Sequence, residues 1–174
     1  FWEPKPAEEL YDLTQDQWEV NNLAKSPAHR SVLERFRKEL ARTIFEIRDV
    51  GFLPEAEIHA RAGNRTPWEM GHDPKAYPLD RIYAMADLAS NRNPSAVPSL
   101  EKGLRDSDSA VRYWAALGFV IRGNSAVKGR EALLAKAMGD DSTFVRVAAA
   151  EALGLYGNSE QSRRSLDLLV DLAD

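Results

Sequence analysis

The sequence contains no cysteine among its 174 residues. Disulfides, thiolate metal sites and cysteine nucleophiles are therefore excluded, although this absence does not assign a redox compartment. Long apolar runs are also missing, because none approaches the roughly 20 residues that a membrane-spanning helix needs. The start has no signal-peptide pattern. A composition of 44% hydrophobic and 29% charged residues is that of a soluble globular chain, so we expect no membrane partner.

A basic strip is the next missing feature. The formal net charge is -4, and the lysines and arginines are spread along the chain without interleaved aromatic residues. Nucleic-acid binders gather such side chains on one face, where they neutralise phosphates. We therefore expect no nucleic-acid partner.

The strongest positive signal is an internal repeat. The stretch from Asp106 to Asn124 returns from Asp140 to Asn158, with each match 34 positions later. A period of this size is typical of stacked helix pairs, in which each unit covers the apolar face of its neighbour. The repeat predicts a mainly α fold that contains a short α-solenoid. The positions that match in phase are Asp106, Val111, Arg112, Ala115, Ala116, Gly123, Asn124 and Ser125.

Each copy of the repeat is predicted to contain two helices. In the second copy one apolar stripe recurs at helical spacing. Gly157 follows this stripe and is suited to end a helix. Asp141 or Ser142 is the expected N-cap at its start. The stripe consists of Val145, Ala148, Ala149, Ala152, Leu153 and Tyr156.

This pattern resembles the HEAT repeats, in the short form also seen in phycobilisome-lyase-like proteins. The resemblance rests on a turn aspartate followed by Val-Arg one turn into the second helix, then Ala-Ala and Gly-Asn. It implies that Arg112 and Arg146 reach the turn aspartates Asp106 and Asp140 and form a structural ladder along the stack. Asp140 and Asp141 are accordingly expected at a helix cap and not at a metal site.

The first residues differ from the repeats. The segment 9–13 is short and apolar enough to predict one β-strand, followed by a turn at 14–17. A lone strand is not stable. Because the chain begins at Phe1 without an initiator methionine, we expect an excised piece whose partner strands lay upstream.

The same residues resemble the closing segment of the type I sulfatases, which are sulfuric ester hydrolases. The resemblance is carried by residues 9–13, Asp16, Glu19 and 21–24, and Gln17 departs from it where the family usually has proline. It implies the last strand and turn of a small C-terminal sheet, followed by a long helix, within residues 1–50. We expect the partner of this piece to be the catalytic domain that lies upstream in the same protein.

The sulfatase resemblance also implies where the chemistry lies. In that family, a formylglycine made within a C/S-x-P-x-R motif and a calcium ion act together in the catalytic domain. No such motif occurs here, because the proline of the segment 26–30 stands at the wrong position. We therefore expect no catalytic residue, metal or cofactor in this chain. Sulfatases of this kind are usually exported, which implies a periplasmic or extracellular location.

A long amphipathic helix is predicted next. Ser26 is the expected N-cap, Pro27 suits the first helical position, and Gly51 and Pro54 end the pattern. In the intact protein we expect this helix to lie across the small sheet. Its apolar face consists of Leu33, Phe36, Leu40, Ile44 and Ile47.

Residues 51–77 form an irregular linker with short helical turns. Thr66 and Glu69 predict a capping box. One hypothesis is that His59, Arg61, Arg65 or His72 meets a sulfated substrate, since arginine binds sulfate by forked hydrogen bonds. The alternative is that the linker packs over the core domain through Trp68 and Met70. The two histidines lack the spacing of a helical metal pair, and a zinc site would lack ligands.

Residues 78–174 are predicted to hold the repeats. A first helix around Ile82 caps the stack, two full pairs follow, and residues 160–174 form the first helix of another unit. Leu166, Leu169 and Val170 are expected to point inward from that helix.

Three functions remain open. The first is that the chain is the non-catalytic C-terminal region of a sulfatase, in which the helical stack supports the small domain or recruits a partner or glycan. Alternatively it is a stand-alone HEAT-repeat protein-binding adaptor. The third hypothesis, an enzyme that resembles the phycobilisome lyases, lacks a nucleophile with a base, a metal cluster and a cysteine.

Overall fold

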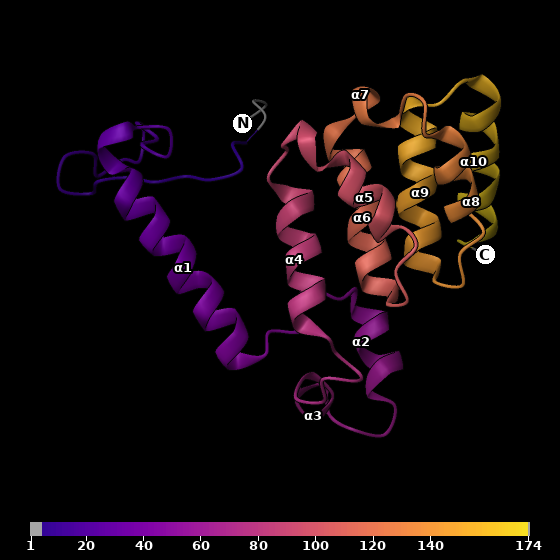
Figure 1. The fold of residues 1–174 in the computed structure, drawn as a ribbon, viewed down its shortest axis with the longest axis horizontal. Coiled ribbons are helices and arrows are strands. Elements are labelled where there is room, and N and C mark those ends of the chain that lie inside the picture. The colour runs from indigo at the N-terminus through magenta and orange to yellow at the C-terminus, as the bar shows by residue number, and fades with distance from the viewer. Residues whose placement is uncertain (1–4, 174) are drawn as a thin grey trace. The chain divides into compact units, whose positions relative to one another are not determined.

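The computed structural model describes residues 5–173, and these residues form helices, turns and loops without a β-strand. The prediction of a mainly α fold is confirmed (Figure 1). The chain divides into two compact units, one up to Asp49 and the other from Val50 onward. The helices are α1 (Arg30–Ile47), α2 (Glu55–Ala62), α3 (Pro67–Gly71), α4 (Leu79–Ser90), α5 (Val97–Gly103), α6 (Ser109–Arg122), α7 (Asn124–Val127), α8 (Glu131–Ala137), α9 (Thr143–Tyr156) and α10 (Ser159–Asp171), with 3-10 turns η1 (Pro27–His29) and η2 (Pro94–Ala96).

The predicted β-strand at residues 9–13 is wrong for the residues that the structure describes. The Leu10 amide donates to Asn22 Oδ1 at 3.0 Å, and Asn22 Nδ2 donates to the Glu8 carbonyl at 3.0 Å. The Leu23 amide also donates to the Leu10 carbonyl at 2.7 Å. A side-chain amide thus satisfies backbone groups that a neighbouring strand would otherwise pair. One short segment without such a neighbour stays a loop.

The other residues that carry the sulfatase resemblance close this same loop. Asp12 Oδ1 accepts hydrogen bonds from the Thr14 amide and hydroxyl, at 3.0 and 2.6 Å. Asp16 Oδ2 accepts from the Asn21 amide at 2.7 Å. Short polar side chains that bond to nearby backbone amides stabilise turns. The resemblance therefore coincides with a loop that its own side chains hold in shape.

Helix α1 follows the loop, with its predicted apolar face only partly covered. Leu33 and Ile44 are buried, whereas Phe36, Leu40 and Ile47 are exposed. Ser26 precedes the 3-10 turn η1, but its side chain makes no capping hydrogen bond. The helix ends at Arg48, whose left-handed conformation stops it before Gly51.

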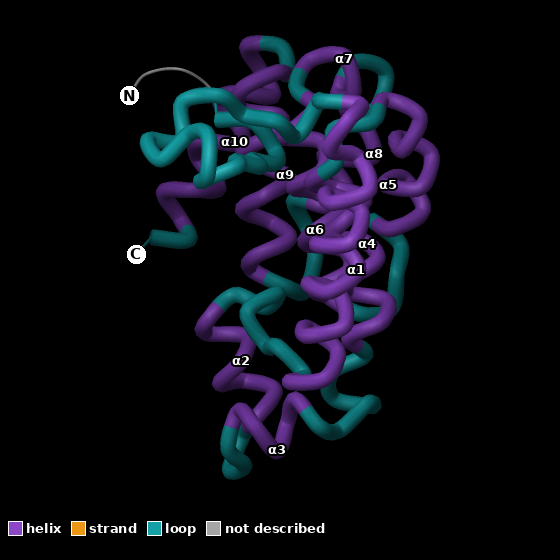
Figure 2. The backbone as a smooth tube through the Cα atoms, turned by 90° about the vertical axis from the view of Figure 1, so that its left-hand side faces the viewer, coloured by secondary structure: helices purple, strands orange, loops and turns teal. Residues whose placement is uncertain are grey.

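The second unit is a row of packed helices. Helices α4, α6, α9 and α10 follow one another in space, and each contacts the next (Figures 1 and 2). Helix α5 packs on α6, and α8 packs on α9. Small residues in α6 and α9 let these neighbours approach closely. The largest buried apolar side chains in this core include Leu100, Phe119, Leu134 and Leu153.

Helix α10 has a different orientation from the predicted one. Leu166 and Val170 are exposed, and Ser165 is buried. The Ser162 hydroxyl donates to the Gly154 carbonyl at 3.0 Å, and a Cβ added to Gly154 would lie 3.6 Å from Ser165 Cβ. The small-residue face of α10 therefore packs on α9, which rotates Leu166 and Val170 outward. None of the described helices is long and apolar enough to cross a membrane.

Gly118→Ala should destabilise the protein. An added Cβ would lie 2.6 Å and 2.8 Å from the two Cδ atoms of Leu100, a fully buried side chain. Overpacking costs about 1–3 kcal/mol and should exceed the gain in helix propensity of at most about 1 kcal/mol. Gly154→Ala is the matched control, because its Cβ finds ordinary contact and should stabilise by about 0.5–1 kcal/mol. Urea unfolding measures both, and equal effects would contradict the expected close approach of α5 and α6.

Candidate functional site

Arg61 is the centre of a buried polar network in the second unit. Its side chain extends from α2 to the start of α6. Nε donates to Glu57 Oε1 at 2.9 Å, and the two terminal nitrogens donate to the Asp108 carboxylate at 2.9 and 3.0 Å. Further hydrogen bonds of 2.9 Å reach the Ala76 carbonyl and the Ser109 hydroxyl. The guanidinium thus joins the linker, α2 and α6.

The charges in this network are largely removed from water. The Arg61 side chain is 15% exposed, and those of Glu57 and Asp108 are 9% and 12% exposed. Burial by itself would raise the pKa of Asp108, but hydrogen bonds from Arg61 and from the amides of Ala110 and Val111 outweigh it and lower this pKa. Burial opposes the charge on Arg61 as well, and its hydrogen bonds to Asp108 and Glu57 leave its pKa raised. Both groups stay ionised as a pair.

The four residues predicted near a substrate lie in different surroundings. Arg61 is in the buried network, whereas His59 is exposed on α2. Arg65 donates to Asp73 Oδ2 at 2.9 Å and to the Arg61 carbonyl at 3.3 Å. His72 Nδ1 lies 2.8 Å from the Trp68 carbonyl oxygen. The Arg61 guanidinium could bind a sulfate only by giving up protein partners.

Sequence reasoning missed Glu57, Asp108 and Ser109 as members of this network. A partial signal was present, because Glu57 and Arg61 stand at the i, i+4 spacing of helical ion pairs. Asp108 also caps α6 by accepting from the amides of Ala110 and Val111. The contact between Arg61 and Asp108 joins positions 47 residues apart, and no local pattern indicates it.

Arg112 of the first copy of the repeat and Asp140 of the second copy contact each other. Arg112 donates to both carboxylate oxygens of Asp140, at 2.7 and 2.8 Å, and to the Asp106 carbonyl at 2.9 Å. Asp106 itself pairs with Arg81 of α4. Asp140 also accepts from the Ser142 amide at 2.8 Å. The Arg112–Asp140 and Arg81–Asp106 ion pairs each tie a turn to the preceding helices.

Arg146 occupies the equivalent position in the second copy but has a different environment. Its Nε donates to the Met138 carbonyl at 3.3 Å, and within residues 5–173 it forms no ion pair. Ser142, one of the two predicted cap residues, occupies the N-cap position of α9, but its side chain makes no capping hydrogen bond there.

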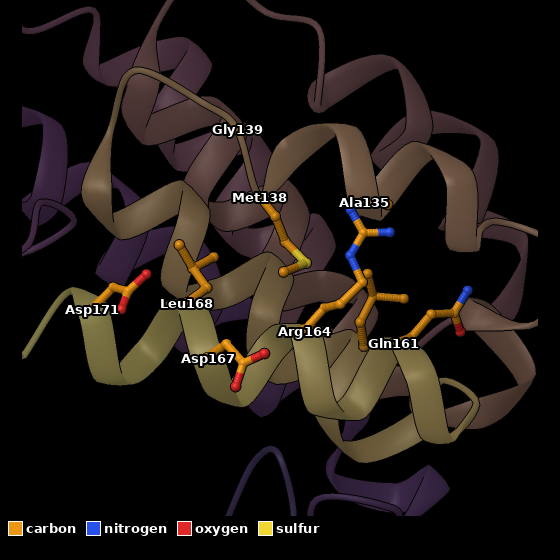
Figure 3. A pocket seen from close by; sticks show the side chains of 9 residues that line it. Ala135, Met138, Gly139, Gln161, Arg164, Asp167, Leu168 and Asp171 are labelled. Carbon is orange, nitrogen blue, oxygen red and sulfur yellow. The ribbon is translucent and has the colours of Figure 1, made fainter.

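A groove of about 460 Å³ lies between α8 and α10 (Figure 3). The side chain of Met138 points between those of Leu168 and Arg164, and Leu153 of α9 also lines the groove. Gln161, Asp167 and Asp171 line its α10 side. Among the described residues of the whole chain, no group of three or more histidines, aspartates or glutamates could hold a metal ion. The groove therefore offers apolar contact from Met138, Leu153 and Leu168, with polar side chains along its α10 side.

Comparison with curated proteins found one partial relative. An ulvan-active sulfatase from Formosa agariphila is 43% identical over 58 residues, which are 33% of this chain and 10% of that protein. The matched region thus spans about a tenth of the length of the sulfatase. No protein-family model and no solved structure matches the chain. The chain is related in part to a sulfatase.

Arg61→Gln should be strongly destabilising. The substitution leaves Glu57 and Asp108 as buried carboxylates without their cation, and breaking a buried pair costs about 3–5 kcal/mol. Arg65→Gln is the control, because its more exposed ion pair should contribute less than about 1 kcal/mol. Denaturant unfolding of both variants makes the comparison. Similar losses for the two would show that Arg61 does not carry the packing of the linker.

Stability should depend on pH through Asp140. Burial raises its pKa, but the hydrogen bonds from Arg112 and the Ser142 amide outweigh burial and lower it below the ordinary value of 3.8. Its stabilisation is therefore complete above that value and is lost as the pH falls through the lowered pKa. Asp140→Asn should be less stable at pH 7 and less sensitive to acid. Thermal unfolding from pH 7 to pH 3 measures this, and an unchanged slope in the variant would exclude the pair as its cause.

Proposed function

We propose that this chain is a non-catalytic C-terminal fragment of a sulfatase, a sulfuric ester hydrolase. In this proposal it is a structural and interaction scaffold beside the catalytic domain. The observation that carries it is the 43% identity over 58 residues with the ulvan-active sulfatase. The loop at residues 8–24, which holds the sulfatase-like residues in a defined shape, gives further support.

The first unit has an apolar surface that suits packing on a larger domain. Leu40 of α1 is 60% exposed, and Phe36 and Ile47 on the same face are also exposed. Trp18 and Val20 of the loop are exposed as well. The buried apolar side chains between residues 5 and 49 are Leu10, Leu33 and Ile44. Three such side chains are too few to offset the entropy cost of ordering this segment, so its partner in the proposal is the catalytic domain.

The chemistry belongs to that catalytic domain. The resemblance implies formylglycine and calcium there, and the residues of this chain do not fit either group. The described residues hold no cluster that could bind a metal, and the sequence has no C/S-x-P-x-R motif. A catalytic domain of this kind is usually exported, so the proposal includes a periplasmic or extracellular location.

The second unit is proposed to be a HEAT-like solenoid. The repeat of 34 residues, the row of helices and the Arg112–Asp140 ion pair support this interpretation. A stack in which each pair of helices contacts its neighbours makes an extended support. In the intact enzyme this support would hold the linker at a fixed place.

A stand-alone HEAT-repeat adaptor is the second candidate, and one observation favours it. Ile121 of α6 and Leu155 of α9 are equivalent positions of the repeat, and both are exposed. Val147 of α9 is exposed as well. Apolar residues that recur outward in register offer a surface to a protein partner.

The coding sequence upstream of Phe1 separates the two candidates. The sulfatase proposal expects a continuous reading frame with a C/S-x-P-x-R motif, whereas an initiator methionine directly before Phe1 would leave only the adaptor. The longer chain then allows a test of the apolar face of α1.

In the longer chain, Leu40→Gln should lower the thermal unfolding temperature by several degrees. Loss of a buried leucine at a domain contact costs about 2 kcal/mol or more. In the chain of 174 residues the same substitution should have little effect, because Leu40 is already exposed. Lys38→Gln, on the opposite side of α1, is the control and should be neutral in both. An equal response of Leu40→Gln in the two chains would refute the packing of α1 on the catalytic domain.

A further inference from the structure

Helix α3 presents a tryptophan to solvent. The helix lies beyond the ends of α4 and α6, at one end of the second unit (Figures 1 and 2). Trp68 is 67% exposed, whereas Met70 of the same helix is fully buried. Of the two residues expected to pack the linker on the core, Met70 fixes α3 to the unit, whereas Trp68 points outward. The indole is available to a ligand.

The backbone beneath Trp68 is held in place from several sides. The Thr66 hydroxyl accepts from the Glu69 amide at 3.2 Å, and Glu69 Oε2 accepts from the Thr66 amide at 2.7 Å. This capping box fixes the start of the helix, and Pro67 at the first helical position restricts the backbone further. An exposed side chain on such a support loses little conformational freedom when it binds.

His72 covers one side of the indole and leaves the other open. The two ring centroids are 4.1 Å apart, with the planes 30° from parallel. Since Trp68 is still 67% exposed, the second face of its indole is not stacked in the same way. The Trp68 carbonyl oxygen can only accept a hydrogen bond, so His72 Nδ1 at 2.8 Å donates to it. In the neutral imidazole, Nε2 is then an acceptor.

We propose that Trp68 and His72 form a binding site for a sugar ring of a glycan. The apolar C–H face of a six-membered sugar packs on a flat aromatic surface, and its hydroxyl groups need hydrogen-bond partners at the edge. The open indole face supplies the first contact. His72 Nε2 accepts from a hydroxyl group, and Arg65 and Asp73 provide further polar groups beside α3.

The surroundings of Trp68 favour a sugar over a protein surface. Within the linker, residues 51–77, Trp68 is the only exposed large apolar side chain among the described residues. A protein interface has a contiguous apolar centre that excludes water. One aromatic face among polar groups suits a ligand that has both an apolar face and a polar edge. This inference rests on the proposed function, in which the parent enzyme acts on a sulfate ester, and it names a glycan as the bearer of that ester.

The test is a titration of the full chain with ulvan fragments, before and after chemical removal of their sulfate, followed by calorimetry and by NMR of the indole signals. Both preparations should bind, because the site recognises the ring. Trp68→Ala should weaken binding at least about tenfold, which corresponds to the loss of roughly 1.4 kcal/mol, and should leave the unfolding temperature unchanged. His72→Phe keeps an aromatic ring for stacking but removes the acceptor, so it should weaken binding less than Trp68→Ala.

Trp18→Ala is the matched control, because Trp18 is 79% exposed in the other unit and should not affect binding. The site is disproved if Trp68→Ala binds as the unchanged chain does, if both tryptophan variants lose binding equally, or if neither fragment preparation binds at millimolar concentration. Binding of the sulfated fragments alone would also overturn it, since recognition would then follow charge. These outcomes are independent of the upstream reading frame, so failure of the sugar site and failure of the sulfatase proposal can be told apart.

Discussion

The buried guanidinium of Arg61 is the constraint on which the second unit depends most. Its hydrogen bonds reach α2, the end of the linker and the N-terminus of α6. A buried cation must keep its partners, because breaking a buried ion pair costs about 3–5 kcal/mol. Residues 51–77 therefore pack as part of the helical unit. This explains why α3 has a defined position although it contains only five residues.

Much of the helical architecture could be predicted from periodicity. The repeat indicated helices near 109–122 and 143–156, because each copy buries one stripe of small apolar residues against its neighbours. The Thr66–Glu69 capping box was also predictable, since both partners lie within four residues. The strand at 9–13 was wrong because apolar composition does not supply a pairing partner. Its backbone is satisfied instead by Asn22, twelve residues away from Leu10.

The candidate site shows more clearly that composition and local pattern do not reveal contacts between distant positions. A list of polar residues in the linker contains Arg61, Arg65 and His72, but composition does not tell which are buried. Arg61 is buried and paired with Asp108, which lies 47 positions away, whereas the side chain of Arg65 is 42% exposed. The orientation of α10 has a comparable cause, because Ser162 and Ser165 fit against Gly154 more closely than leucines would. Such preferences appear only when the two surfaces are brought together.

The linker thus divides its polar and aromatic residues between two roles. Arg61 and Met70 face inward and fix the segment to the helices, and this rigidity is what allows Trp68 to remain exposed in a defined orientation. An aromatic ring on a mobile loop would lose conformational entropy on binding, which would weaken a contact of only one ring face. In the function that we propose, the chain would contribute to recognition through this indole without catalytic residues of its own. The buried ion pairs of the helical unit and the exposed indole are then parts of one arrangement, in which stability at one position supports the proposed binding at the other.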